Sequence, residues 1–346
     1  MPYRSRVPRC LLAISCCATL AASCGGSAAG SHPSAVPASP SSGCRKAAAA
    51  HSTAKVTPTA GPVSHYSVGG GPTGLVQASG QLWFSDTGGS RIGRLAPDGG
   101  LTTWDLGSAM PGFLAIGPDG GVWAPEEATG SVVHIAPDGA VFDCPLPTRT
   151  GTPFGLTLGP DGNLWVAEKD GARIARMTPA GDTVEFTVPG GGSPVFIVAG
   201  PDGNLWFTEG GGGQIGRVTP AGSITMFPLP TSAGGEGAMT IGPDRALWFT
   251  EFTHGAIGRI DTSGRIKEFP VAPGSDSRPN GIVAGPDGAL WFTESGLGRI
   301  GRITAAGAIS QRDAVGGFPD QLLFAGDGSL WVTAFQAGEV IRLVNP

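Results

Sequence analysis

Seven tryptophans recur in one local phrase along this chain, and their spacing constrains the fold more than any other feature. Intervals of 40, 42, 41, 42, 43 and 40 residues separate Trp83, Trp123, Trp165, Trp206, Trp248, Trp291 and Trp331. The phrase around each is a variant of G-P-D-G-x-L-W-F-T-E, followed by a variant of I-G-R-I-T-x-x-G. A period of about 41 residues that holds several short strands is typical of a β-propeller blade. Seven such periods predict seven blades.

Each period contains four short runs that suit strands. In the fourth unit these are 194–199, 205–208, 214–219 and 223–227, separated by glycine loops and by Pro-x-Gly turns. Proline sets φ for the first turn position and glycine takes the positive φ that closes the turn. The run with the tryptophan is apolar almost throughout, as expected for a strand buried on both faces. No segment shows a helical period, so we predict an all-β fold with four-stranded blades.

The two ends of the repeat region complement each other. The last unit stops after its third strand, 340–343, and an additional strand, 63–68, precedes the first unit. We expect this N-terminal strand to complete the seventh blade, because closing the ring removes exposed strand edges. The propeller is then a single domain over residues 62–346.

The first 61 residues have a different composition. Basic residues precede a short apolar run, 11–20, as in a secretory signal. Residues 20–27 look like a bacterial lipoprotein cleavage site with Cys24 as the lipidated residue. We therefore expect residues 1–24 to direct export and membrane anchoring, with cleavage and secretion as the alternative. Residues 25–61, rich in Ala, Ser, Pro and Gly, are expected to form a flexible tether.

Two cysteines lie outside the signal and the lipoprotein site. Cys44 is in the expected tether and Cys144 is in the outer strand of the second unit. An exported compartment permits a disulfide, but the geometry that a disulfide needs cannot be read from a sequence. A Cys44–Cys144 bond and two free thiols both remain open.

Charge and hydropathy limit the classes of partner. A formal net charge of −5 offers no basic face for nucleic acid. The propeller has no run of the 18 or more apolar residues that a membrane-spanning helix needs. We expect a monomer whose partner is a small molecule, a peptide or a cell-envelope ligand, with the membrane reached only through the lipid anchor.

An acidic residue stands three positions after six of the seven tryptophans, where the second strand should run out at one end of the central channel. The series is Asp86, Glu126, Glu168, Glu209, Glu251 and Glu294, and Ala334 interrupts it. One interpretation is a cation-binding or acid–base rim. The other is structural: each carboxylate accepts from backbone donors or pairs with an arginine of the following strand, namely Arg94, Arg176, Arg217, Arg259 or Arg302.

Single-copy chemistry needs residues that break the repeat. The position after the start of each inner strand should face the same channel mouth, and it holds Thr73, Gly112, Phe154, Val195, Gly237, Asn280 and Asp320. Only Asn280 and Asp320 offer polar groups suited to chemistry, and they lie on adjacent blades, although turn capping would also explain them. Arg278, Phe318 and Gln321 are their neighbours in sequence, and His254 lies in the corresponding loop of blade five, where a solvated histidine is the simpler interpretation.

The blade phrases, repeated seven times with an N-terminal closing strand, closely resemble those of the streptogramin B lyases (the virginiamycin B lyase family). The resemblance covers residues 62–346. It implies a Mg²⁺-dependent lyase that opens the ester of a cyclic depsipeptide by elimination, breaking a carbon–oxygen bond. It also implies an active site at the channel mouth, on the last two blades.

The residues that carry this activity in the family are replaced here. Asn280 stands where the family has a histidine on blade six. The family's Glu-Pro-His on blade seven reads Phe318-Pro319-Asp320, and a further family glutamate falls at Phe335. Thr73 takes the place of a tyrosine on blade one. An elimination needs a general base and a polarising metal, and Asp320 is the one carboxylate left at a matching position.

Three functions therefore stay open. The first is an exported propeller that binds a ligand at its mouth without catalysis, through Arg278, Asn280, Phe318, Asp320, Glu251 and Glu294. The second is a diverged metal-dependent enzyme on the same scaffold, with Asp320, Asn280 and His254 as catalytic candidates and Asp320 as the candidate metal ligand. The third is a true streptogramin B lyase. Mg²⁺ is a possible cofactor only through the family resemblance, and fold alone cannot choose between the three.

Overall fold

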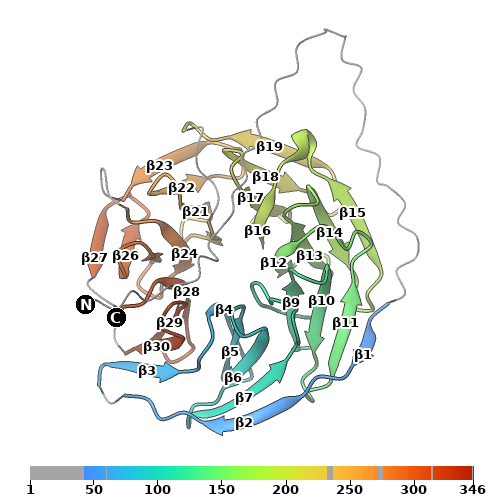
Figure 1. Ribbon diagram of the computed structural model, residues 1–346. Helices are drawn as coiled ribbons and strands as arrows, with labels where there is room; N and C mark the ends of the chain where they lie inside the picture. The colour runs from blue at the N-terminus through green and yellow to red at the C-terminus, as the bar shows by residue number, and fades with distance from the viewer. Residues whose placement is uncertain (1–42, 60, 232–236, 272–275, 313–314, 345) are drawn as a thin grey trace, which may run out of the picture. The chain divides into compact units, whose positions relative to one another are not determined.

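The computed structural model describes residues 43–59, 61–231, 237–271, 276–312, 315–344 and 346. Within these residues the chain is all-β, apart from a single 3₁₀ turn, η1 (Pro189–Gly191). Seven antiparallel sheets follow one another around a ring (Figure 1), as the tryptophan spacing predicts. No helix among the described residues has the length and apolar character to cross a membrane. The expected signal and Cys24 lie outside the described residues and stay predictions.

Blades three to six are the regular units, and each has its four strands in sequence order from the inside of the ring outward. Blade three is β12 (Pro153–Leu158), β13 (Leu164–Glu168), β14 (Arg173–Met177) and β15 (Thr183–Thr187). Blade four is β16 (Pro194–Ala199), β17 (Leu205–Glu209), β18 (Gln214–Val218) and β19 (Ile224–Pro228). Blade five is β20 (Met239–Ile241), β21 (Leu247–Glu251), β22 (Ala256–Ile260) and β23 (Ile266–Pro270). Blade six is β24 (Pro279–Ala284), β25 (Ala289–Glu294), β26 (Arg299–Thr304) and β27 (Ile309–Arg312).

Blades one, two and seven use strands from the N-terminal region as well. Blade one is β4 (Pro72–Ala78), β5 (Gln81–Asp86), β6 (Arg91–Leu95) and β7 (Gly100–Asp105), with β2 (His51–Lys55) outside them. Blade two is β8 (Ala115–Ile116), β9 (Val122–Glu126), β10 (Ser131–Ile135) and β11 (Val141–Pro145), with β1 (Arg45–Ala47) outside them. Blade seven is β28 (Pro319–Phe324), β29 (Leu330–Ala334), β30 (Glu339–Leu343) and β3 (Val63–Ser67).

The ring closes through the N-terminal strand, as predicted. Strand β3 pairs antiparallel with β30, from Val63 opposite Leu343 to Ser67 opposite Glu339. The imidazole of His65 also lies 2.9 Å from the Glu339 carboxylate across this pairing. The seventh sheet thus joins the two ends of the repeat region, and its outer edge is covered by a strand that precedes the first blade.

Residues 43–59, which we call the strap, differ from the flexible tether expected for 25–61. Strand β1 pairs with β11 on the outside of blade two, and β2 pairs with β7 on the outside of blade one. A disulfide between Cys44 and Cys144 fastens the beginning of the strap to blade two, which settles the question that the sequence left open. The expectation is therefore corrected for this stretch: the open edges of two blades supply backbone partners that the segment lacks on its own.

Adjacent blades are joined near the axis by side-chain hydroxyls two positions after the tryptophan. The hydroxyl of each donates to a carbonyl oxygen in or just before the next blade's inner strand: Thr208 to Gly237, Thr250 to Asn280, Thr293 to Asp320 and Thr333 to Thr73. Three of these hydroxyls also accept an N–H from the inner strand of their own blade, namely those of Thr208, Thr293 and Thr333. These bridging hydroxyls hold the inner strands in register around the mouth.

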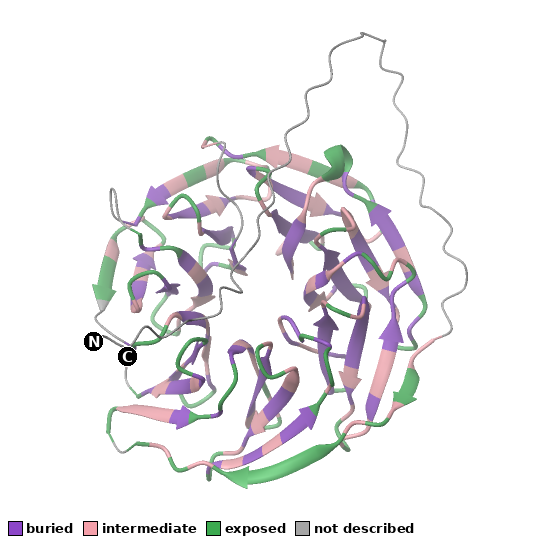
Figure 2. Ribbon diagram, viewed as in Figure 1, coloured by how far each residue is buried: buried purple, intermediate pink, exposed green. Residues whose placement is uncertain are grey.

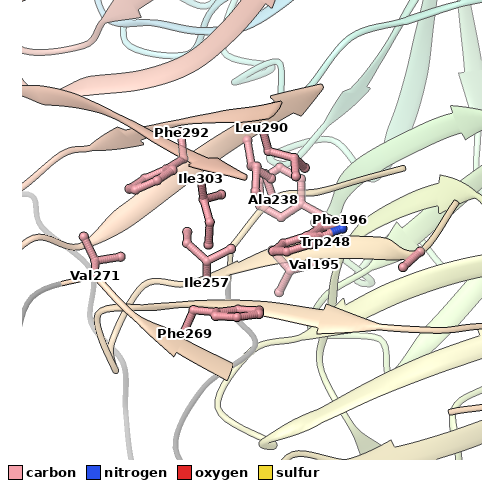
Figure 3. Packing of buried hydrophobic residues seen from close by; sticks show 12 residues of the cluster. Val195, Phe196, Ala238, Trp248, Ile257, Phe269, Val271, Leu290, Phe292 and Ile303 are labelled. Atoms are coloured by element: carbon pink, nitrogen blue, oxygen red, sulfur yellow. The ribbon is translucent and has the colours of Figure 1, made fainter. Parts of the chain in front are cut away.

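The tryptophans pack between blades, with one exception. Six of the seven expose 7 % or less of their surface, as expected for the main anchors of the core. Trp248, for example, stacks on Phe269 of its own blade and shares a cluster with Leu290 and Phe292 of the next (Figure 3). Trp331 is the exception and is partly exposed. Buried residues otherwise fill the second and third strands, and exposed residues follow β2 and the turns (Figure 2).

Candidate functional site

The mouth is the end of the ring where the inner strands begin and the second strands end. Pairings such as Pro279 with Glu294 and Pro319 with Ala334 bring these two ends together in each blade. Two positions per blade therefore surround the mouth. The first follows the start of the inner strand, as given above. The second lies four residues after the tryptophan, and is Thr87, Glu127, Lys169, Gly210, Phe252, Ser295 or Phe335.

Asn280 and Asp320 meet at the mouth, as their sequence positions suggested. The Asn280 side-chain amide donates from Nδ2 to Oδ1 of Asp320 over 2.5 Å. Gly281 allows this approach, because a Cβ there would lie 2.5 Å from the Asp320 carbonyl oxygen and 3.0 Å from the Cα of Gln321. The glycine thus lets the inner strands of blades six and seven lie close enough for the two side chains to bond.

The environment of Asp320 changes its acidity. The residue is 7 % exposed, and this burial raises the pKa of its carboxyl to about 7. Removing a carboxylate from water disfavours the charged form, and the single amide donor of Asn280 does not compensate. Near neutral pH the Asp320 carboxyl is therefore divided between its acid and its carboxylate forms.

The remaining sequence candidates are spread over the mouth and its loops. Arg278 is exposed and Phe318 is partly buried, and both have left-handed φ values, 47° and 49°. The same conformation recurs at Met110 and Thr152, the equivalent positions of blades two and three, so it belongs to the repeat. His254 is exposed in the loop between β21 and β22, away from the Asn280–Asp320 pair in sequence and in blade.

Gln321 faces a mixed environment one position beyond Asp320. Its backbone N–H donates to the Thr333 hydroxyl, while its side-chain Nε2 is buried and has no partner among the described residues. An unsatisfied buried amide donor costs free energy. This N–H group is available to a carbonyl or hydroxyl that enters beside the inner strand of blade seven.

The six recurring acids are buried side chains rather than an exposed rim. None exposes more than 7 % of its surface, and Glu251 and Glu294 are at 0 %. Asp86 is the acid with the most hydrogen-bond partners. Its carboxylate accepts the backbone N–H groups of Gly71 and Gly89 and the Nε–H of Arg91. The structural interpretation holds for this blade.

The arginine partners named from the sequence are wrong. Arg94, Arg176, Arg217 and Arg259 instead lie over the tryptophan of their own blade, at 5.4 to 6.0 Å from the ring centre. Arg302 pairs with Asp287, in the turn before its blade's tryptophan. The register explains the error, because Arg94 is paired with Trp83 whereas Asp86 is paired with Arg91. The residue opposite each acid is thus three positions earlier than the arginine predicted from the sequence.

Several of these buried acids lack partners, and their acidity shifts accordingly. Burial, reinforced by the nearby Glu185 charge, raises the pKa of Glu168 to about 8. Burial and the Glu268 charge likewise raise the pKa of Glu251 to about 8. Both carboxyls are therefore largely uncharged at pH 7. They add little negative potential to the mouth.

The structure adds two features of the mouth, an aromatic cluster and a charged pair, to the residues that the sequence singled out. Phe113, Phe154 and Phe196, from the inner region of blades two to four, pack against one another with ring centres 4.4 to 5.7 Å apart. Beside them the Lys169 ammonium lies 5.6 Å from the centre of the Phe154 ring. Burial raises the pKa of Glu127 to about 7, although the Lys169 charge opposes the shift.

The charged pair could have been found by comparing the blades with one another. Glu127 and Lys169 occupy the position four residues after the tryptophan, where blades four and six have the small residues Gly210 and Ser295. Comparing this position across all the blades would have singled them out by their charge. The mouth thus has an aromatic and charged side on blades two to four and a polar side on blades six and seven.

The described residues do not fit a magnesium site like the one that the resemblance implies. Mg²⁺ demands nearly octahedral oxygen coordination, and Phe318 and Phe335 have no oxygen in their side chains. Asp320 offers one carboxylate, which Asn280 already engages. No group of three or more His, Cys, Asp or Glu side chains suited to a metal ion occurs within the described ranges. We derive no chemical step through a metal at this position.

Comparison with known proteins places these observations in a family context. The Virginiamycin B lyase family matches residues 62–275 and 193–345, which together span the propeller. The search of curated proteins found no match.

Three solved structures illustrate the likeness. Selenomethionine-substituted virginiamycin B lyase from Staphylococcus aureus is 34 % identical with a TM-score of 0.75, covering 85 % of this chain and 99 % of that one. A catalytically inactive histidine-to-alanine variant from the same organism, with quinupristin, has the same identity and coverage and a TM-score of 0.76. A streptogramin B lyase structure is 31 % identical with a TM-score of 0.75, covering 84 % and 97 %.

Proposed function

The chain belongs to the Virginiamycin B lyase family. From this premise we propose that the protein binds a ligand at the mouth and does not catalyse the opening of an ester ring in that ligand. The observation that carries the proposal is the Asn280–Asp320 hydrogen bond on blades six and seven. These residues stand where the resemblance predicts two histidines. An asparagine amide cannot accept a proton as a general base. The Asn280 amide also donates a hydrogen bond to the Asp320 carboxylate, which engages one oxygen of that group.

The distribution of histidines supports the same conclusion. A histidine-to-alanine substitution gives the catalytically inactive relative, so at least one histidine matters in that protein. In the described part of this chain, His51 and His65 are on outer strands, and His134 stacks on Trp123 within blade two. His254 alone is in a loop at the mouth end, and it is exposed. None lies on an inner strand of blade six or seven.

The two sides of the mouth suggest the chemistry of the ligand. Phe113 and Phe154 are partly exposed and pack against the buried Phe196, and their aromatic surface favours apolar or aromatic ligand groups. Asn280, Asp320 and the exposed Arg278 offer hydrogen bonds and charge on the far side of the ring. A compact small molecule or peptide with an apolar face and a polar edge meets both. Glu251 and Glu294 are buried and take no part in this proposal.

Quinupristin, found with a relative, is a suitable probe. Purified protein is titrated with quinupristin in a calorimeter with Mg²⁺ present, and the recovered ligand is weighed by mass spectrometry. We expect saturable binding with the ligand mass unchanged. Ring opening that EDTA abolishes would overturn the proposal in favour of a true lyase, and the absence of binding would exclude streptogramins as its ligands.

A second candidate function rests on the acidity of Asp320. A general base works best when its pKa is close to the operating pH, and burial gives the Asp320 carboxyl a pKa of about 7. A diverged enzyme on this scaffold would use Asp320 to accept a proton. Turnover that rises with pH around 7 and disappears in Asp320→Asn would favour this candidate, whereas binding that survives the substitution without turnover would favour the first.

The site of action follows from the N-terminal region and remains a proposal. We propose that the protein is exported and anchored through Cys24, with secretion as the alternative. The Cys44–Cys144 disulfide supports export, because disulfides persist in oxidising compartments. Radiolabelled palmitate should enter the wild-type protein and not Cys24→Ser. Equal labelling of both would contradict the anchor.

A further inference from the structure

The repeat is broken at the boundary between blade seven and blade one, on the turns opposite the mouth. In blades three to six the tryptophan indole N–H donates to the aspartate four residues earlier: Trp165 to Asp161, Trp206 to Asp202, Trp248 to Asp244 and Trp291 to Asp287. In blade seven the corresponding aspartate is Asp327. No hydrogen bond from the Trp331 indole is found among the described residues.

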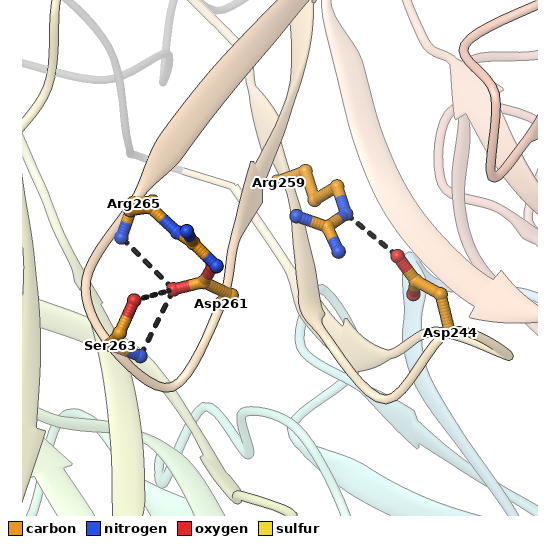
Figure 4. A network of polar contacts seen from close by, with 5 residues as sticks. All are labelled: Asp244, Arg259, Asp261, Ser263 and Arg265. Atoms are coloured by element: carbon orange, nitrogen blue, oxygen red, sulfur yellow. Dashed lines mark hydrogen bonds and ion pairs between the residues drawn. The ribbon is translucent and has the colours of Figure 1, made fainter.

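In blade seven Ser329 occupies the aspartate oxygen that accepts the indole in blades three to six. The Ser329 hydroxyl donates to Oδ1 of Asp327 over 2.6 Å, and its backbone N–H donates to the same oxygen. Blades five and six have alanine at this position, Ala246 and Ala289, and there Oδ1 accepts the indole. In blade five the other oxygen of Asp244 pairs with Arg259, as Figure 4 shows.

A short turn in blade one opens space beside Trp331. Blade one joins its first two strands through Ser79 and Gly80. Trp83 follows Thr73 by ten positions, whereas Trp331 of blade seven follows the equivalent Asp320 by eleven. The missing residue belongs to the turn that carries the aspartate in the other blades, such as Asp327 in blade seven. The neighbouring side chains do not refill the gap, and Trp331 stays partly exposed.

The result is a pocket of about 100 Å³. Its lining includes the rings of Tyr66 and Trp331, the apolar side chains of Leu82 and Leu95, and the polar side chains of Gln77 and Arg342. Tyr66 and Trp331 lie 5.3 Å apart between ring centres. A closed cavity of about 150 Å³ lined by apolar residues binds benzene. This pocket is smaller and partly open, so it can take part of a single ring while the rest of the ligand stays in solvent.

The polar groups restrict the ligand further. Arg342 donates to Oδ2 of Asp327 over 2.6 Å, so its charge is already balanced and the pocket has no free cation for an anion. Gln77 accepts the Gly326 N–H through Oε1, which leaves its amide protons as donors. Together with the Trp331 N–H, the pocket therefore offers donors and needs a neutral acceptor.

We propose that this seam pocket, formed by Tyr66, Gln77, Leu82, Leu95, Trp331 and Arg342, binds a small neutral molecule in which one ring carries a carbonyl group. The ring packs against Tyr66 and Trp331, and the carbonyl oxygen accepts the Trp331 indole N–H. The pocket is separate from the mouth, so it does not depend on the function proposed there.

The test uses benzamide as the probe and the indole N–H signals of ¹⁵N-tryptophan protein as the readout. Trp331→Phe identifies the Trp331 signal. We expect this signal to move saturably, with a Kd of about 1 mM for so small a molecule, while the other indole signals stay in place. Benzoate should bind more weakly, because Arg342 is already paired with Asp327 and the pocket has no free cation for the carboxylate. A Trp331 signal that does not move up to about 20 mM benzamide would overturn the proposal.

Two further variants test separately the hydrogen bond from the Trp331 indole and the volume of the pocket. Ser329→Ala restores the residue of blades five and six, so Oδ1 of Asp327 becomes free to accept the Trp331 N–H. We expect about 3- to 10-fold weaker benzamide binding, the usual worth of one hydrogen bond. Unchanged affinity would show that the indole N–H is not the donor.

Ala96→Phe places a ring in the pocket, which Ala96 lines, and should abolish the shift of the Trp331 signal. Ala136→Phe is the matched control, because Ala136 begins the same Ala-Pro-Asp-Gly turn on blade two. Binding lost in Ala96→Phe and kept in Ala136→Phe supports the assignment. Binding kept in both, or lost in both with the fold intact, places the probe elsewhere.

Discussion

The Thr333 hydroxyl on the last blade donates to the Thr73 carbonyl oxygen on the first over 2.8 Å. The same hydroxyl accepts the backbone N–H of Gln321. The two blades lie at opposite ends of the repeat region, so this one side chain ties the beginning of the ring to its end near the axis. Strands β3 and β30 do the same at the outside.

Thr333→Val keeps the shape of the side chain and removes both hydrogen bonds. We expect a loss of about 1–3 kcal/mol in the free energy of unfolding, because a buried donor and a buried acceptor lose their partner. Thr240→Val is the control, since no hydrogen bond of the Thr240 hydroxyl is found in the described structure. Urea titrations compare the two, and equal effects would contradict the closing role of Thr333.

Trp206→Ala and Trp331→Ala test the packing between blades. Trp206 is fully buried, and its loss should cost about 3–5 kcal/mol, as large-to-small core substitutions do. Trp331 is partly exposed beside the seam pocket, so its loss should cost less, about 1–3 kcal/mol. Chemical denaturation measures both. The reverse order would mean that the exposure of Trp331 does not reflect weaker packing.

The buried glutamates predict a stability that falls as pH rises. Burial raises the pKa of Glu168 and of Glu251 from 4.5 to about 8 in the folded protein. Between these values the folded state binds more protons than the unfolded state, so folding stability is lost between about pH 5 and 8 and levels off above. Glu168→Gln and Glu251→Gln should each flatten the decline, measured by urea midpoints at several pH values.

Asp261→Asn provides the control for this pH dependence. Burial acts to raise the pKa of Asp261, but hydrogen bonds from Ser263 and Arg265 outweigh it and lower the pKa (Figure 4). A depressed carboxyl loses its stabilising effect only in acid. The variant should therefore leave the slope between pH 5 and 8 unchanged.

Restoring the family residues should restore chemistry if the scaffold is otherwise intact. The combined variant Asn280→His, Phe318→Glu, Asp320→His and Phe335→Glu introduces the general base and the metal-binding groups that the resemblance implies. With Mg²⁺ and quinupristin we expect ring opening at least about 10²-fold above the wild type, the usual scale of general-base catalysis. Mass spectrometry detects it. Failure in a folded variant would show that other parts of the mouth have diverged as well.

Removing the disulfide tests the strap. Cys44→Ser cuts a link across a sequence separation of 100 residues, and such links typically contribute about 2–5 kcal/mol. We expect a lower melting temperature for the variant, and a similar one for the wild type in dithiothreitol. If the reductant destabilises the variant by as much as the wild type, the effect does not come from Cys44–Cys144.

The fold was accessible from the sequence because each blade repeats the same packing. Trp206 and its equivalents mark the second strand, Pro-x-Gly turns mark the ends, and 63–68 lacks a partner unless it joins 340–343. The strap was not accessible. Its segments His51–Lys55 and Arg45–Ala47 carry no pattern of buried positions, and their partners are edges formed by β7 and β11.

The sequence predicts where the residues of the mouth lie, but only part of their hydrogen bonding and acidity. Adjacent blades and equivalent positions brought Asn280 to Asp320, and the structure shows their bond. The acidity of Asp320 depends on burial by other blades, which no local pattern reports. Glu127 and Lys169 lie four positions after their tryptophans, at a position where the seven blades share no single residue type. The repeat pattern therefore does not mark them.

The strap also bears on the order in which the chain can assemble during synthesis. Strands β1 and β2 can pair as soon as blades one and two have been synthesised, which is complete at Pro145. Strand β3 must wait for β30, and Glu339 lies 274 positions after its partner His65. Contacts so distant in sequence are slow to form, since a long loop must close first. A strap already bonded to blades one and two shortens that search, because β3 is then held next to blade one, beside which blade seven arrives. The strap thus keeps β3 beside the position that blade seven takes when it folds.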